Sequence, residues 1–172
     1  MQKLIGIICI ITASAGMGYR RGIELTRELS ELQEIRKIFL MLRSEVEYAQ
    51  SPMDDAFYQI GERLSGHYQR WLCSLAENLE QRTGQNFQEI WEISVQSCLL
   101  ESHLSRKNLG FLKNMGANLG HYDRTMQIGA IDLYLEQLKL SIQNMQEEIP
   151  EKRRILNCLG VMGGIFVAVI LM

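Results

Sequence analysis

The last eighteen residues of the chain, 155–172, contain no charged side chain and follow directly on three cations. As a helix with a rise of 1.5 Å per residue, this run would be about 27 Å long, close to the roughly 30 Å hydrocarbon layer of a membrane. Its only clearly polar side chain is Asn157, and it lacks the polar stripe that a core helix turns to solvent. The run therefore predicts a membrane-spanning helix at 155–172.

A second uncharged run near the N-terminus ends at Arg20 and Arg21. Two interpretations fit it. Residues 4–22 form an uncleaved transmembrane helix, or the first residues are a cleaved signal peptide, because residues 13–15 read Ala-Ser-Ala, the A-x-A form of a cleavage site. We favour the uncleaved helix, since two arginines directly after an apolar run disfavour its translocation.

Positive charges stand at the inner edge of both apolar runs: Arg20, Arg21, Lys152, Arg153 and Arg154. Lys- and Arg-rich flanks of membrane spans stay in the cytoplasm. We therefore expect both termini outside, and residues 23–151 inside as one cytosolic domain.

The region between the spans shows helical periodicity and no period-two strand of useful length. The predicted helices are 23–49, 52–64, 68–81, 87–100, 106–119 and 124–148. In the first of them, the face opposite the apolar one carries the charged residues Arg27, Glu28, Glu31, Glu34, Arg36 and Lys37. The sequence thus predicts an all-α fold, a cytosolic bundle of about six helices flanked by N- and C-terminal transmembrane helices.

Residues that favour helix N-caps precede four of these helices: Ser51, Asn86, Ser105 and Asp123. Pro52 follows the first cap at the first helical position, where proline is favoured. Glu89 stands three residues after Asn86, as in a capping pair. Gly120 is the expected C-cap of the helix that ends at residue 119.

The residue types that carry chemistry do not form a recognisable catalytic, cofactor or metal site. The histidines at 67, 103 and 121 lie near predicted helix boundaries, and the cysteines at 9, 73, 98 and 158 lack the spacing of a zinc site or a disulfide framework. There is no phosphate-binding glycine loop and no H-E-x-x-H. A net charge of −2 argues against nucleic-acid binding. We expect Trp71 and Trp91 in the core, and a non-enzymatic protein that docks other proteins.

Three stretches resemble a known family. Residues 42–53 are similar to its pattern L-x-x-E-I-x-Y-x-x-T-P-L, residues 112–123 contain its F-G-x-x-L-G-x-x-D pattern with Met in place of Phe, and residues 156–164 resemble the start of its last span. Together with the length and the paired spans, the chain is identified as a member of the stage III sporulation protein AB family of endospore-forming bacteria. Ser51 and Met53 depart from the family's usual Thr and Leu, and the region after the first span lacks an expected proline.

The resemblance implies a role that the composition does not show. The family acts in the mother cell, in the complex that links it to the forespore, and its cytosolic domain resembles those of type II secretion platform proteins. The implied partners are the complex's secretion-type ATPase, stage III sporulation protein AA, and other membrane proteins of the complex; homo-oligomerisation is compatible with this role. The implied location is the mother-cell membrane around the forespore, with two spans and the central domain in the cytosol.

The family patterns gather in two places, which are therefore the candidate partner interface. Its residues are Glu45, Glu47, Tyr48, Pro52, Asp55, Gly120, Asp123 and Arg124. The alternative is that these residues are caps and turns that the fold requires. The rival for the protein as a whole is a secreted or surface-exposed helical binding protein with a cleaved signal peptide and a C-terminal anchor.

Overall fold

The computed structural model covers residues 1–172. It describes the backbone at 2–49, 51–81, 84–120 and 123–171. Side chains are described within these ranges from residue 23 to residue 151, and beyond that at Arg154, Ile155 and Met162.

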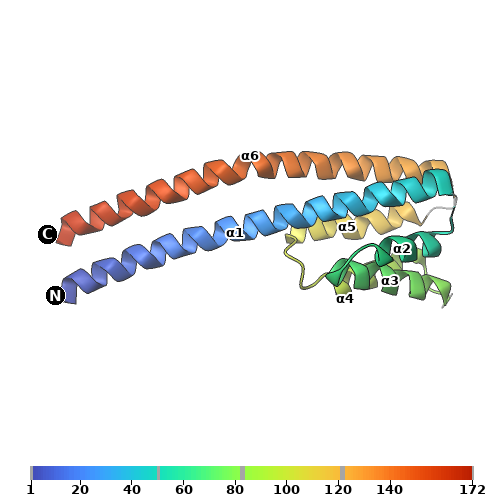
Figure 1. The fold of residues 1–172 in the computed structure, drawn as a ribbon, viewed down its shortest axis with the longest axis horizontal. Coiled ribbons are helices and arrows are strands. Elements are labelled where there is room, and N and C mark those ends of the chain that lie inside the picture. The colour runs from blue at the N-terminus through green and yellow to red at the C-terminus, as the bar shows by residue number, and fades with distance from the viewer. Residues whose placement is uncertain (1, 50, 82–83, 121–122, 172) are drawn as a thin grey trace. The chain divides into compact units, whose positions relative to one another are not determined.

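Six α-helices and one π-helical turn make up the described backbone, which contains no strand (Figure 1). Their bounds are α1 Gln2–Ser44, η1 Glu45–Ala49, α2 Met53–Glu62, α3 Gly66–Glu80, α4 Phe87–Cys98, α5 Arg106–Leu119 and α6 Arg124–Leu171. The all-α prediction with about six helices is confirmed for these residues. The continuous α1 agrees with the absence of a helix breaker after the first apolar run, and α6 continues through Pro150.

Several predicted helix boundaries are wrong by one or two residues: α2 ends at Glu62 instead of 64, α3 spans Gly66–Glu80 instead of 68–81, and α4 ends at Cys98 instead of 100. Two further differences are larger in their local geometry. Helix α2 begins at Met53, and Pro52 is its N-cap rather than its first residue, with the Pro52 carbonyl accepting from Ala56 N at 3.0 Å. The predicted α-helix to residue 49 ends at Ser44 and continues as the π-helical turn η1. Such turns hold one residue more than an α-turn, and here Val46 is buried while Tyr48 is 76% exposed.

The caps that the sequence indicates are used in part. The Ser105 hydroxyl accepts from Asn108 N at 3.4 Å at the start of α5, and Gly120 is the C-cap of that helix. Asn86 occupies the N-cap position of α4 but makes no side-chain cap bond. Two glycines have positive φ, Gly66 at 72° and Gly84 at 78°, a conformation that side chains with a Cβ rarely adopt.

Residues 31–140 form one compact unit, which contains the core. Its inner positions follow the apolar stripes of the helices, because each amphipathic helix turns one face away from water. The largest fully buried side chains are those of Trp71, Trp91, Phe39, Phe57, Leu32, Ile35, Ile38, Leu42, Ile60, Leu72, Leu75 and Leu99. The expectation that both tryptophans lie in the core is confirmed.

Trp91 of α4 stands at the centre of this core. Its ring lies against four aromatic rings at centroid distances between 5.2 and 6.4 Å, those of Trp71, Phe57, Phe87 and Phe39. Its indole Nε1–H donates to the Leu112 carbonyl of α5 at 2.8 Å. Gly116, one turn further along α5, lies directly beneath the indole, where a Cβ would come within 2.4 Å of Trp91 Cδ1. The α4–α5 contact therefore depends on a missing side chain.

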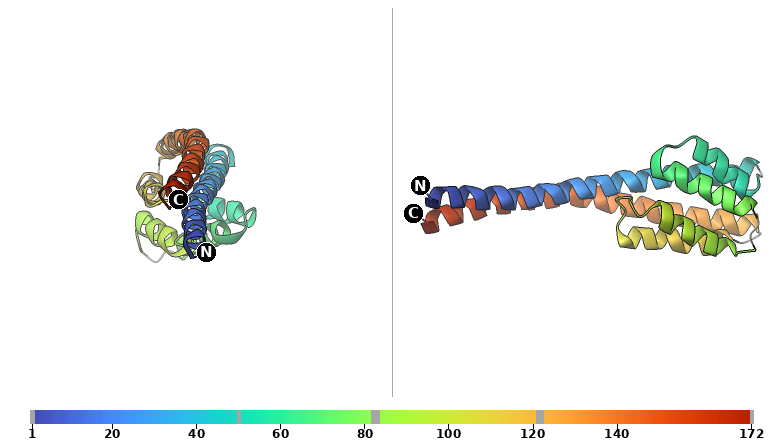
Figure 2. Two further views of the ribbon diagram at one scale, coloured as in Figure 1. Left: turned by 90° about the vertical axis from the view of Figure 1, so that its left-hand side faces the viewer. Right: turned by 90° about the horizontal axis from the view of Figure 1, so that it is seen from below.

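The second unit consists of residues 1–30 and 141–172, the N-terminal part of α1 and the C-terminal part of α6 (Figures 1 and 2). A search of the described residues finds no helix with a stretch long and apolar enough to cross a membrane. Most side chains of the two predicted spans lie outside the described residues: all of those at 4–22, and those at 155–172 other than Ile155 and Met162. The two spans therefore stay predictions.

Candidate functional site

The first part of the candidate interface, from Glu45 to Asp55, lies on η1 and the start of α2. Tyr48, Pro52 and Asp55 are exposed, whereas the Glu47 side chain is 31% exposed and that of Glu45 only 14%. The surface that a partner could reach here is therefore formed mainly by the tyrosine ring, the proline and the aspartate.

The two glutamates of η1 are engaged within the chain. Arg63 Nη2 lies 4.0 Å from Glu45 Oε1, and Arg43 of α1 binds Glu47. The same Arg43 guanidinium donates to Asp132 of α6 through Nε at 2.6 Å. The Asp132 hydrogen bond raises the pKa of Arg43 above its usual value, with a further contribution from Glu47. Arg43 thus joins α1, η1 and α6.

The second part of the interface, from Gly120 to Arg124, contains residues with evident roles in the fold. A Cβ at Gly120 would lie 3.3 Å from Phe87 Cδ1, so this position is tight against α4. The Asp123 Oδ1 accepts from Thr125 N at 2.8 Å, which is a cap at the start of α6. Arg124 is exposed. For Gly120 and Asp123, these contacts favour the alternative that the fold itself requires the residues.

Of the predicted topology determinants, only Arg154 has a described side chain, and it is exposed. The side chains of Arg20, Arg21, Lys152 and Arg153 lie outside the described residues. The inside–outside assignment that rests on them stays a prediction.

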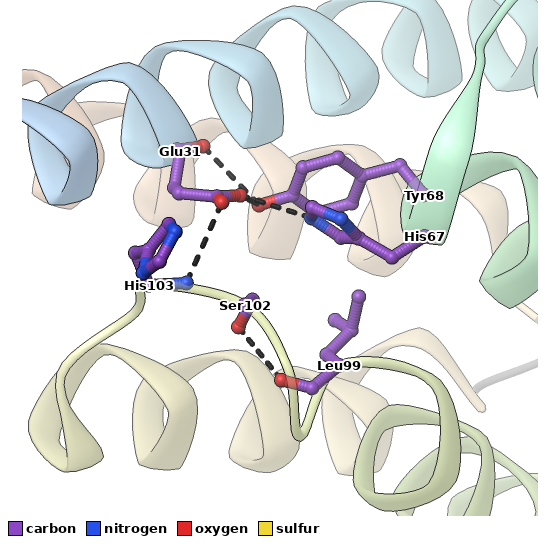
Figure 3. Close-up of polar contacts among 6 residues, drawn as sticks. All are labelled: Glu31, His67, Tyr68, Leu99, Ser102 and His103. Carbon is purple, nitrogen blue, oxygen red and sulfur yellow. Dashed lines mark hydrogen bonds and ion pairs between the residues drawn. The ribbon is translucent and has the colours of Figure 1, made fainter.

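A buried carboxylate cluster joins three segments of the compact unit (Figure 3). Glu31 of α1 has a side chain only 11% exposed, and its Oε2 accepts from the Tyr68 hydroxyl at 2.5 Å and lies 3.0 Å from His67 Nε2. Its Oε1 accepts from the backbone N–H of His103 at 3.4 Å. We call these four residues the Glu31 cluster. The sequence pattern placed Glu31 on the charged face of its helix and did not indicate that its carboxylate is largely covered.

Electrostatics keep the Glu31 carboxylate charged despite its burial. Burial alone would raise its pKa, but the hydrogen bonds from Tyr68 and His67, an electrostatic contribution from His67 and the His103 N–H together lower it below the usual value. Burial and the neighbouring Glu31 carboxylate raise the pKa of Tyr68 well above its usual range. The tyrosine is therefore a neutral hydroxyl donor to an ionised acceptor at neutral pH.

The Glu31 cluster is arranged for binding within the protein and not for acid–base chemistry on a substrate. Three donors already occupy the carboxylate, and the nearby Ser102 hydroxyl donates to the Leu99 carbonyl at 2.7 Å (Figure 3). Over the residues that were searched, no group of three His, Cys, Asp or Glu side chains could hold a metal ion. Cys73 and Cys98 are free thiols. His121 lies outside the described residues.

These observations define the class: over the described residues, an all-helical protein whose polar clusters hold its own helices together. The sequence matches the stage III sporulation protein AB family over residues 3–172. The chain therefore belongs to that family, whose name is that of a sporulation protein and not of an enzyme.

Two relatives agree with this assignment. Stage III sporulation protein AB of Bacillus subtilis (strain 168) is 23% identical over 172 residues, which cover 100% of both chains. A solved structure of stage III sporulation protein AB is similar with a TM-score of 0.65 and 22% identity, covering 72% of this chain and 97% of the other. That likeness shows the fold.

Proposed function

We propose that this protein is a non-enzymatic membrane platform in the secretion-like complex that connects mother cell and forespore. In this role it couples a cytosolic secretion-type ATPase, stage III sporulation protein AA, to membrane components of the complex. The observation that carries the proposal is the family match over 3–172, because it includes both cation-bounded apolar ends as well as the helical bundle. The helices transmit force and the ATPase supplies the chemistry.

The proposed location is the mother-cell membrane around the forespore, with spans at 4–22 and 155–172. The apolar side chains of Ile155 and Met162 support this, since they are 57% and 71% exposed on α6. Both side chains lie in the uncharged run 155–172, whose length and lack of charge favour a membrane span. In this arrangement the bundle lies in the cytosol.

Protease treatment of intact protoplasts tests the topology. We expect residues 23–151 to survive outside protease and to be digested only after the membrane is opened. Digestion from outside would refute the two-span topology with a cytosolic bundle. Mass spectrometry of the extracted protein tests the rival, because loss of residues 1–15 would identify a cleaved signal peptide and a secreted binding protein.

The ATPase is proposed to bind at the exposed residues of η1 and the start of α2. Tyr48, 76% exposed, is the type of residue that contributes most to binding when a partner buries it. Exposed Asp55 adds negative charge beside it and favours a basic partner surface. Glu45 and Glu47 are less suitable for the test, because charge reversal there would also break contacts with Arg63 and Arg43.

Affinity capture from sporulating cells tests this surface with matched variants. Tyr48→Ala and Asp55→Lys should each reduce recovery of the ATPase, whereas Leu100→Ala should not. Leu100 is also exposed, at 69%, but it lies in the α4–α5 connection, the segment whose His103 contacts Glu31. Tyr48 is seventeen residues beyond Glu31, about 26 Å at helical rise, so the control lies at the other end of the unit. Undiminished capture by both variants would exclude this surface, and failure to capture the ATPase with the native chain would refute the platform role.

A further inference from the structure

Glu31 lies at the point where α1 enters the compact unit. The unit begins at Glu31, and α1 runs on from there to Ser44. All of the partners of its carboxylate lie inside the same unit, on the first turn of α3 and in the α4–α5 connection. One side chain of α1 therefore binds two segments that are distant from it in sequence.

The apolar contacts of α1 do not by themselves specify how the helix is rotated about its axis. Leu32, Ile35 and Phe39 are buried to within 1% exposure and form a wide apolar stripe. Such stripes tolerate repacking as long as volume and pattern are kept. Hydrogen bonds to a buried carboxylate are directional, and a rotation that moved Glu31 away would leave a charge without partners.

The segments that carry the donors also have local contacts of their own besides those with Glu31. Gly66 precedes His67 and has a φ of 72°, and nothing lies within 4 Å of its Cβ position. The direction in which α3 begins is therefore set here by the backbone conformation of a glycine and not by side-chain packing. In the α4–α5 connection, the backbone N–H of Ser102 donates to the Leu99 carbonyl at 3.2 Å, and its hydroxyl donates to the same oxygen at 2.7 Å. These bonds fix the segment that offers the His103 N–H.

We propose that Glu31 is a positioning residue that fixes the rotation of α1 within residues 31–140, by binding the start of α3 and the α4–α5 connection at the same time. Any partner that displaces α1 by rotation must break all of these contacts together. Helix α1 therefore has one preferred rotation about its axis, and a change of rotation breaks the contacts with α3 and with the α4–α5 connection in the same step. This inference rests on the geometry of the Glu31 cluster and does not depend on the platform role.

Hydrogen exchange of the full-length chain tests the proposal through Glu31→Gln. Glutamine has the same shape but offers one acceptor oxygen and adds two donors, so it cannot satisfy the cluster. We expect amide exchange at least about tenfold faster in 31–35, 66–70 and 99–105 together, the size of effect that loss of a charged hydrogen bond produces. Exchange in 112–116, which packs on Trp91, should not change. The matched control is Glu136→Gln, which removes an exposed pair with Lys139. Acceleration confined to 31–35, or equal acceleration throughout the unit, would overturn the proposal.

Glu31→Leu tests whether apolar packing alone can set the rotation of α1. Leucine can fill the space with apolar contacts, but it leaves the Tyr68 hydroxyl and the His103 N–H without their acceptor, so we expect a lower unfolding midpoint. Without the directional bonds, the backbone amides of His67 and His103 should each show more than one NMR signal. A single set of signals at native positions would show that apolar packing alone sets the rotation of α1, and the proposal would be wrong.

Discussion

Gly116→Ala is the sharpest test of the packing between α4 and α5. Alanine is the better helix former, so local propensity predicts a gain of up to about 1 kcal/mol in the interior of α5. The structure predicts the opposite sign. An added Cβ would lie 2.4 Å from Trp91 Cδ1 and 2.6 Å from Cγ. That is about 1 Å less than the roughly 3.5 Å of a relaxed carbon contact.

The indole cannot move freely to relieve this contact. It is fully buried among four aromatic rings, and its Nε1–H donates to Leu112 at 2.8 Å. Overpacking of a core costs about 1–3 kcal/mol. Loss or stretching of the indole hydrogen bond adds about 1 kcal/mol, which roughly offsets the helix-propensity gain. We expect a net loss of about 1–3 kcal/mol in the free energy of unfolding.

Urea unfolding of the full-length chain, followed by far-UV circular dichroism and tryptophan fluorescence, measures this loss. At a typical dependence of about 2 kcal/mol per molar urea, the midpoint should fall by about 0.5–1.5 M. Gly110→Ala is the matched control on the same helix, because nothing lies within 4 Å of its Cβ position. It should raise the midpoint slightly. If Gly116→Ala raised the midpoint as Gly110→Ala does, the close packing of Trp91 on α5 would be refuted.

Three further substitutions or conditions test other parts of the fold. Gly66→Ala should lower the free energy of unfolding by about 1–2 kcal/mol, because φ is positive there although the space is open. An unchanged thermal unfolding midpoint would show that this backbone conformation is not required. Ser105→Ala should cost about 1 kcal/mol in the same assay, and Ser65→Ala less, since only the Ser105 hydroxyl makes a cap bond. The pKa of Glu31 is below its ordinary value of 4.5, so its ionised form stabilises the fold above that pH, and the stabilisation is lost as pH falls through the lowered value. The stability difference between the native chain and Glu31→Gln should therefore be full at pH 7 and shrink below about pH 4, and a difference that grew on acidification would contradict this assignment.

The number of helices and some of their limits could be predicted because their signals are local. Apolar residues at three- and four-residue steps, with Ser105, Gly120 and Asp123 at the boundaries, act within one turn of the chain and need no tertiary partner. The same local reasoning failed at Pro52, which caps α2 instead of beginning it, and at η1, where a π-helical turn replaces an α-helix.

The exposure of part of the candidate interface agrees with the sequence pattern, and partner binding there stays a prediction. The family patterns indicated Tyr48 and Asp55, which the structure places on the surface. They could not separate these from Gly120, which is tight against Phe87, or from Asp123, which caps α6. A residue pattern records that a position is constrained, but only the neighbours in space show whether a partner or the fold imposes the constraint.

The sequence by itself determined the helical class, the family and the prediction of two membrane spans, because periodicity, charge placement and apolar length are properties of the chain read in order. Only the tertiary structure decided that Glu31, one of several charged residues on a polar helix face, is a buried carboxylate held by Tyr68, His67 and the His103 N–H. It likewise decided that Gly116 must lack a side chain beneath Trp91. Both depend on residues brought together from distant parts of the chain, and the free energy of a buried charge or a close contact depends on those neighbours and not on local sequence.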